Sequence, residues 1–246
     1  MTLREKLIAY SIKYEGDYRL IKKALLNQEE VQAVSCSVSI IVKGDRLYPK
    51  SLLLLDDPPF VLYALGNLRL LEKRSISVIG SRSALAYALE MTDFIIQQIP
   101  SDCVIVSGLA KGIDAQAHIA ALKEHRKTIA VLGCGIDIVY PMSNLLLYEQ
   151  IKRDGLILSE YPPHTQIRKH QFIARNRIIA ALGESLVVMQ AAQKSGTMST
   201  VEFALNMGKE IYALPFHLNE AEGSGCNNLI QQGASLLTSE ESLFKL

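Results

Sequence analysis

Two arginines in the stretch FIARNRIIAAL, Arg175 and Arg177, are of a type and in a position that favour anion binding. The apolar residues of this stretch recur with the spacing of a buried helical face, which predicts a helix beginning near Ala174. Both arginines would then lie in its first turn, at the positive end of the helix dipole, where an anion is favoured and a cation is not. They are two residues apart, so on a regular helix they would point in different directions. We therefore expect one to reach a ligand while the other braces the loop, with Asn176 between them.

The segment around this helix carries an excess of positive charge. Residues 161–182 contain no acid, but they include Arg168 and Lys169 together with His164 and His170. The whole chain has a net charge of only +1, so it lacks the global basic field of many nucleic-acid-binding proteins. A local basic stripe on a neutral protein predicts a confined anion site. The alternative is a solvated loop that happens to lack acids.

A second candidate site follows the strand-like run SISVIG. Arg82 comes after Gly80 and Ser81, at a tight turn before a predicted helix, where a guanidinium can clamp a phosphate. The pattern GxGxxG of dinucleotide-binding folds is absent, since Gly80 is the one glycine of the three that is present. We therefore expect no NAD or FAD cofactor. The alternative interpretation of Arg82 is a surface arginine without a role.

The run KSGTMSTVE lies between a later strand-like run and its helix. Backbone amides, the hydroxyl groups of Ser195 and Thr197 and the start of the helix would together form a phosphate cradle. This run is not a P-loop, because the GxxxxGK[ST] spacing is absent and Lys194 precedes Gly196. The alternative is a cluster of Ser and Thr residues that caps the helix.

Three further residues have open interpretations. Asp114 and His118 are four residues apart on one predicted helix face, which is compatible with a metal site or an acid–base pair. Since no third ligand accompanies them, we expect no metal ion, and predict that Asp114 braces its loop and His118 makes a structural polar contact. Phe172 is either a hydrophobic staple at the start of its helix or an exposed platform on which a base stacks.

The elements that must position these residues alternate from about Ser75 onward. Short β-branched runs such as SISVIG, CVIVSG and TIAVLG are each followed by a longer helical pattern. This alternation predicts an α/β protein with a doubly wound, mostly parallel sheet covered on both faces. Ligands of such sheets bind beyond the carboxyl ends of the strands. Residues 80–82, 107–108 and 194–197 are expected at those ends.

The N-terminal part of the chain has a different pattern. Residues 3–33 are charged and helical in character and lead into the apolar run VSCSVSIIV. The stretch LYPKSLLLLDDPPFVLYALGN contains three prolines, which predicts an irregular connector with at most a short strand or helix. We place a small helical appendage at residues 1–45 and the main domain at residues 46–246.

Composition excludes several classes of protein. The longest apolar runs are far shorter than the roughly 20 residues of a membrane-spanning helix, and the first residues lack the apolar core of a signal peptide. The four cysteines are scattered without a CxxC pair, so we expect reduced thiols in a cytoplasmic protein and no structural zinc.

Taken in order along the chain, the motifs resemble those of the DNA-processing protein A family, also called DprA or Smf. The matching blocks run from about residue 47 to 238 and include IGSR, SGLAKGID with a following AH, GCGIDIVYPMSN, LILSEYPP, FIARNRIIAAL, KSGTMST and GCNNLIQQGA. The resemblance implies an extended Rossmann-like fold. It also implies a non-enzymatic, homodimeric cytoplasmic protein that binds single-stranded DNA during natural transformation, protects incoming strands and helps to load the RecA recombinase.

Carried over by motif, the resemblance also assigns roles to residues. Arg82 and Lys169 would contact phosphates, and Phe172 would lie against a base. Ser107 and Gly108 would allow close approach of the backbone, and Arg175 and Arg177 would belong to the walls of the groove. The rim of the pocket would be completed by Lys194, Ser195 and Gly196.

The sequence departs from the family pattern in places. The segment before the connector is shorter than the usual N-terminal domain, and we expect no C-terminal winged helix, which puts duplex contacts in doubt. Pro215-Phe216 stands where Pro-Gly is common, and Tyr87-Ala88 replaces the usual glycine after IGSR.

Two other functions compete with DNA binding. Gly196, Thr197 and Glu202 form a GTxxxxE arrangement that is similar to one in nucleotide phosphoribohydrolases. Those enzymes carry a PGGxGT loop, however, and this chain has no matching pair of carboxylates. A third hypothesis makes the chain an adaptor for which DNA is incidental, and it predicts that Arg82→Ala leaves cellular function intact.

Overall fold

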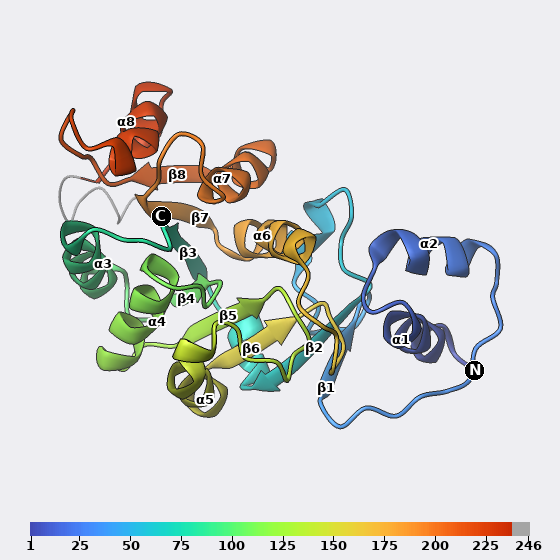
Figure 1. Cartoon of the computed structure of the whole chain (residues 1–246). Helices are drawn as coiled ribbons and strands as arrows, with labels where there is room; N and C mark the ends of the chain where they lie inside the picture. The colour runs from blue at the N-terminus through green and yellow to red at the C-terminus, as the bar shows by residue number, and fades with distance from the viewer. Residues whose placement is uncertain (238–246) are drawn as a thin grey trace.

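The apolar runs that alternate along the chain form the strands of one sheet. The computed structural model describes residues 1–237, and in them the strand order is β1-β2-β6-β5-β4-β3-β7-β8-β9 (Figure 1). The strands are β1 Ser39–Val42, β2 Val61–Gly66, β3 Ser75–Gly80, β4 Val104–Ser107, β5 Thr128–Leu132, β6 Leu156–Ser159, β7 Ser185–Gln190, β8 Glu210–Ala213 and β9 Ser235–Leu236. β2 pairs antiparallel with β1 and β6, and the other pairs are parallel. The predicted α/β class with a mostly parallel sheet is confirmed.

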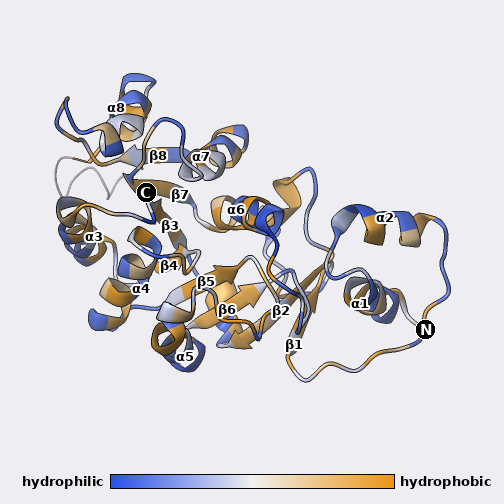
Figure 2. Cartoon of the chain, in the orientation of Figure 1, coloured by the Kyte–Doolittle hydropathy of each residue, from blue (hydrophilic) through white to orange (hydrophobic). Residues whose placement is uncertain are grey.

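Helices cover both faces of this sheet, because most strands are apolar on both sides. They are α1 Leu3–Lys13, α2 Tyr18–Leu26, α3 Ala86–Gln98, α4 Ile113–Lys123, α5 Leu145–Asp154, α6 Lys169–Leu182, α7 Thr197–Asn206 and α8 Ser224–Gln231. One core lies between the sheet and α6, α7 and α8. The cores on the opposite face involve α3, α4 and α5, with α1 and α2 extending the last of them. Figure 2 shows hydrophobic strands between helices whose outer faces are hydrophilic. No helix within residues 1–237 is long and apolar enough to cross a membrane.

The chain reverses its direction across the sheet at β3. It proceeds from β3 through β4 and β5 to β6, and then returns to β7 on the other side of β3. The loops that leave β3 and β7 therefore diverge to opposite faces. This divergence opens a crevice at the carboxyl ends of the two strands, the usual ligand position in doubly wound folds.

The sheet begins earlier in the sequence than predicted. Ser39–Val42 pairs in antiparallel register with residues 61–64, so the end of VSCSVSIIV is an edge strand of the main sheet. This places the first strand before the boundary predicted near residue 45. The predicted connector also contains the full strand β2, which contributes Val61 and Tyr63 to the core beneath α1 and α2. β2 forms because it pairs with β1 on one side and with β6, which is distant in the sequence, on the other.

Helix α6 also begins earlier than predicted. It starts at Lys169, five residues before Ala174, and the Oε1 atom of Gln171 accepts a hydrogen bond of 2.7 Å from the backbone N–H of Arg168. Arg175 and Arg177 therefore lie in the middle of the helix, and the argument that placed them at the positive end of its dipole is wrong. The first turn was missed because its exposed residues Lys169 and His170 carry no apolar periodicity.

Candidate nucleic-acid interface

A cavity of about 340 Å³ lies at the crevice between β3 and β7. Its walls come from the loop after β3, the loop after β7 and the outward face of α6. The polar, charged, glycine and aromatic residues among those that line it are Gly80, Ser81, Arg82, Ser83, Asp114, Phe172, Arg175, Asn176, Ser195, Gly196, Thr197 and Thr200. The tertiary structure thus brings together three segments that the sequence analysis identified separately.

An aromatic ledge with a cation beside it forms the mouth of the cavity. The guanidinium carbon of the exposed Arg82 lies 5.6 Å from the centroid of the Phe172 ring. The Tyr140 ring lies on Phe172 as well, with the ring centroids 5.3 Å apart and the planes inclined by 40°. Gly133 allows this packing, since a Cβ atom there would come within 2.8 Å of Phe172 Cδ1. Phe172 is half-buried and remains open to the cavity.

Arg175 forms the floor of the cavity. Its side chain is buried, and Nη1 donates hydrogen bonds to the carbonyl oxygens of Gly108 at 2.5 Å and Val131 at 2.6 Å. Burial raises the pKa of the neighbouring Asp114 carboxyl, while Arg175 and the backbone amides of Ala110 and Gly108 act in the opposite direction. Asp114 therefore braces the loop beneath Arg175, as the sequence analysis predicted.

The rim of the cavity carries polar groups that could face a ligand. The Nδ2 atom of Asn176 donates to Ser199 Oγ at 2.8 Å, which in turn donates to the Gly196 carbonyl at 2.8 Å. Ser195 Oγ is buried and has no hydrogen-bond partner within the described residues. Lys169 and Lys194 are exposed, and neither lines the cavity itself. Lys169 occupies the first position of α6, one turn before Phe172, and Lys194 lies next to Ser195.

Comparison with known proteins gives the same assignment as the motifs. A family profile described as DNA recombination-mediator protein A matches residues 39–246. The chain belongs to this family. It is 43% identical over 199 residues to the DNA processing protein DprA of Streptococcus pneumoniae, a match that covers 81% of this chain and 71% of the relative. It is 39% identical to DprA of Bacillus subtilis over 85% of this chain and 71% of that relative.

Solved structures of family members share all or most of this fold. The crystal structure of DprA from Streptococcus pneumoniae superposes with a TM-score of 0.87 at 33% identity, over 100% of this chain and 98% of that chain. A structure of DprA from Helicobacter pylori, which concerns the single-stranded DNA binding mode of that protein, has a TM-score of 0.77 at 33% identity. The match covers 85% of this chain and 95% of that one.

Arg177 does not line the cavity between β3 and β7. It is 3% exposed and makes a bidentate ion pair with Glu160, with Nη1 and Nη2 at 2.8 and 2.7 Å from the carboxylate oxygens. Its Nε donates to Asp57 Oδ1 at 2.9 Å. Burial opposes the charge, but the two carboxylates raise the pKa of Arg177 overall. Arg177 therefore lies outside this cavity, and it ties α6 to β6 and to the segment before β2. A contact of Arg177 with DNA stays a prediction.

Ser107 and Gly108 also take internal positions. The Oγ atom of Ser107 donates to the Val78 carbonyl at 2.7 Å, and the residue is fully buried between β3 and β4. Gly108 lies beneath Arg175, where an added Cβ atom would be 2.0 Å from Nη1. Neither residue lines the cavity. The close approach seen in the structure is that of Gly108 to Arg175. A contact of Ser107 or Gly108 with DNA stays a prediction.

His118 makes a structural contact, as predicted. Its Nδ1 atom lies 2.7 Å from Thr128 Oγ1, and burial, with a further effect of Arg175, lowers its pKa to about 3. Within residues 1–237, no group of three His, Cys, Asp or Glu side chains is placed to hold a metal ion.

The sequence analysis missed two exposed residues of this site. Ile173 lines the cavity, and Tyr140 packs against Phe172 at its mouth. A tyrosine in a Tyr-Pro pair of a loop gives no signal by itself. The only pointer was that the pair belongs to GCGIDIVYPMSN, one of the blocks shared with the family.

Proposed function

We propose that this protein binds single-stranded DNA during natural transformation, protects the incoming strand and helps to load RecA onto it. The observation that carries the proposal is the pairing of Arg82 with Phe172 at the mouth of the cavity, 5.6 Å from guanidinium to ring centroid. Proteins that bind single strands combine cations, which contact the phosphates, with aromatic rings, on which the bases stack. Membership of the family supports the same function.

The proposed contacts divide by chemistry. Arg82, Lys169 and Lys194 bind phosphates, because their charged ends are exposed around the cavity. A base stacks on Phe172, with Tyr140 continuing the ledge. Asn176, Ser195 and Gly196 form the rim, and Arg175 holds the floor. A cavity of about 340 Å³ is near the lower limit of small-ligand pockets, so it suits an unstacked nucleotide better than a base pair.

We further propose that the protein breaks no bond in the DNA. The competing enzyme hypothesis needs a carboxylate beside the ribose, and Glu202 is exposed and does not line the cavity. The carboxylate that does line it, Asp114, is 6% exposed and lies against Arg175. Incubation of the purified protein with AMP or CMP should give no free base, and release of base would favour the enzyme.

The partner assignments belong to the same proposal. We propose a homodimer that acts in the cytoplasm and contacts RecA. Sedimentation velocity of the purified protein should give twice the monomer mass, and cell fractionation should recover the protein with cytoplasmic markers. Addition of the protein should accelerate RecA filament assembly on single strands that another single-strand-binding protein already covers. A monomer, or filament assembly unchanged by the protein, would contradict the respective part.

The deciding experiment is fluorescence anisotropy with a labelled oligothymidine, a duplex of equal length and two salt concentrations. Arg82→Ala should weaken single-strand binding by about 10- to 150-fold, since a hydrogen bond to a charged group contributes roughly 1.5–3 kcal/mol. The slope of log K against log salt should also fall by about 0.7. The control variant Arg69→Ala removes another exposed arginine outside the cavity and should bind as the wild type does. Equal binding by wild type and Arg82→Ala would refute the proposed contact.

A further inference from the structure

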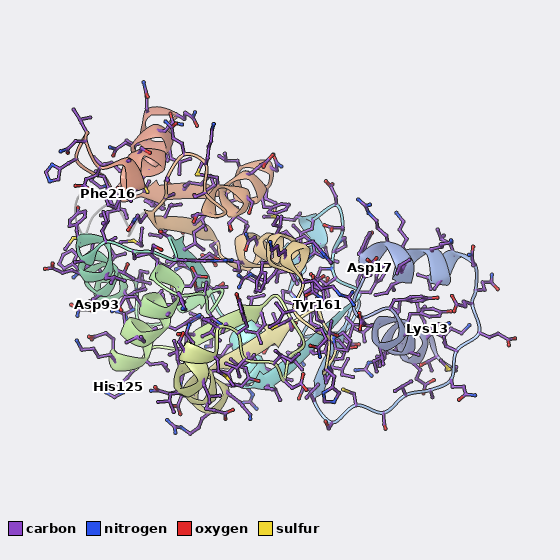
Figure 3. The ribbon with its side chains drawn as sticks, in the orientation of Figure 1. Lys13, Asp17, Asp93, His125, Tyr161 and Phe216 are labelled. Atoms are coloured by element: carbon purple, nitrogen blue, oxygen red, sulfur yellow. The ribbon has the colours of Figure 1, made fainter. Side chains whose placement is uncertain are left out.

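A second and larger cavity separates the N-terminal appendage from α6. It has a volume of about 1030 Å³, and its walls come from the α1–α2 turn, α2, the segment before β2 and the first turns of α6. Asp17 and Tyr161, both labelled in Figure 3, line it from the appendage and from the main domain. We call this cavity the α2 groove.

The α2 groove is held open by fixed contacts between its two sides. Gly16 has φ +77°, and an added Cβ atom would be 2.5 Å from the Glu160 carbonyl oxygen, so the α1–α2 turn packs directly on the end of β6. Arg168 forms an ion pair with Glu15 at 2.6 Å across the groove. In the core that joins α1 to the sheet, Tyr63 Oη donates to Ser11 Oγ at 3.0 Å. These contacts fix the position of α2 relative to α6.

The charges of the groove are unequally available to a ligand. Of its carboxylates, Glu160 and Asp57 bind Arg177, Glu15 binds Arg168, and Asp17 accepts a hydrogen bond from a backbone N–H at the start of α2. In contrast, Arg19, Lys22 and Lys23 of α2 are exposed, and none forms an ion pair within residues 1–237. Asp56 is the one acid of the groove without a partner in the described residues. Five acids and five Arg or Lys side chains line the groove, so the two charges balance in number. The cations that have no ion pair within the described residues are the three on the exposed side of α2.

An aromatic side chain accompanies these cations. Tyr18 lines the groove, and its ring stacks on Phe60 with centroids 5.0 Å apart and planes at 13°. The Nζ atom of Lys22 lies 5.9 Å from the Tyr18 ring centroid. Basic side chains around an aromatic ring are the features that recur on surfaces that bind single strands.

The groove adjoins the first cavity at one residue of α6. Ile173 lines both, and Lys169, one helical turn before it, is exposed at the start of α6. A strand with one base on Phe172 can therefore continue over Ile173 into the groove.

We propose that the α2 groove binds the next segment of the same DNA strand, with Lys22 and Lys23 as phosphate contacts. This inference rests on the proposed function, and it assigns the appendage a direct part in DNA binding.

The test compares Lys22→Gln/Lys23→Gln with the control Lys73→Gln/Lys123→Gln, which makes the same change in net charge at exposed lysines that line neither cavity. For an oligothymidine of about 20 nucleotides, longer than one single-strand site, loss of two phosphate contacts should lower the salt slope by about 1.4 and the affinity at 0.1 M salt by about 25-fold. An oligothymidine of about four nucleotides, measured by competition, should bind the variant and the wild type equally, because it fills only the first cavity.

A second measurement uses the wild-type protein. Acetylation of lysines, read by mass spectrometry, should be reduced at Lys22 and Lys23 by the long oligonucleotide and not by the short one. If the long oligonucleotide fails to protect them, or if polyglutamate protects them and DNA does not, the proposal is overturned. If Arg82→Ala weakens binding as expected while the lysine variant matches its control at both lengths, the groove proposal fails and the proposed function stands. Absence of binding by the wild type would instead refute the proposed function.

Discussion

Substitution of Arg177 tests whether this basic residue of α6 stabilises the fold or contacts DNA. Arg177→Met keeps an unbranched apolar stem but removes the charged guanidinium. It leaves Glu160, which is 4% exposed, without its partner and removes the hydrogen bonds to both Glu160 oxygens and to Asp57. Removal of one member of a buried ion pair costs about 3–5 kcal/mol, because the remaining charge is uncompensated. We expect the free energy of unfolding, from urea titration, to fall by about this amount.

Two further variants separate lost charge from lost packing. Arg177→Met/Glu160→Gln removes the stranded carboxylate as well and should recover much of the stability. Arg177→Lys retains the charge but not the planar fork that binds Glu160 in bidentate geometry, so its stability should be intermediate.

DNA binding is the decisive readout for this side chain. Below its melting temperature, Arg177→Met should bind oligothymidine within about twofold of the wild type, a difference of less than 0.5 kcal/mol. The reasoning would be refuted by unchanged stability together with lost DNA affinity, since Arg177 would then contact the strand.

Two further predictions concern the aromatic ledge and acid stability. Tyr140→Ala should weaken binding of oligothymidine about 5- to 150-fold, because stacking on an aromatic ring contributes roughly 1–3 kcal/mol per base; Tyr140→Phe should bind normally in the same anisotropy assay, and equal affinity for wild type and Tyr140→Ala would contradict the ledge. Burial lowers the pKa of His118 to about 3 from its ordinary value of 6.5, so the unfolded chain takes up the proton first and stability falls as the pH drops below that ordinary value. The wild type should therefore lose about 2 kcal/mol more than His118→Gln between pH 7 and pH 5 in urea titrations, whereas the exposed His125→Gln should behave as the wild type does.

The position of the site follows from the topology of the sheet more than from any one motif. Because β3 lies between β4 and β7, the loops carrying Arg82 and Ser195 leave adjacent strands and turn to opposite faces. Helix α6 then closes the crevice with Phe172 and Asn176 on its outward side. The same helix fixes its inward side through Arg177.

The sequence alone determined the class of fold, the loops that carry the site and the family. These properties depend on local signals: β-branched runs alternating with helical periodicity, small residues after strands, and motifs in a fixed order. The same signals did not predict elements whose residues show no apolar periodicity or whose strands are very short. The first turn of α6 is polar and exposed, and β1 is a strand of four residues at the edge of the sheet.

The tertiary structure alone decided which basic residues are available to a ligand. In FIARNR, Arg175 donates to the carbonyl of Gly108, 67 residues earlier, and Arg177 binds Asp57, 120 residues earlier. Arg82, in contrast, finds the ring of Phe172, and Lys22 and Lys23 remain unpaired within the described residues. A guanidinium has the same charge and donors in every context, so its role depends on whether folding places carboxylates or carbonyls around it. Such partners come from distant parts of the chain, and no local pattern records them.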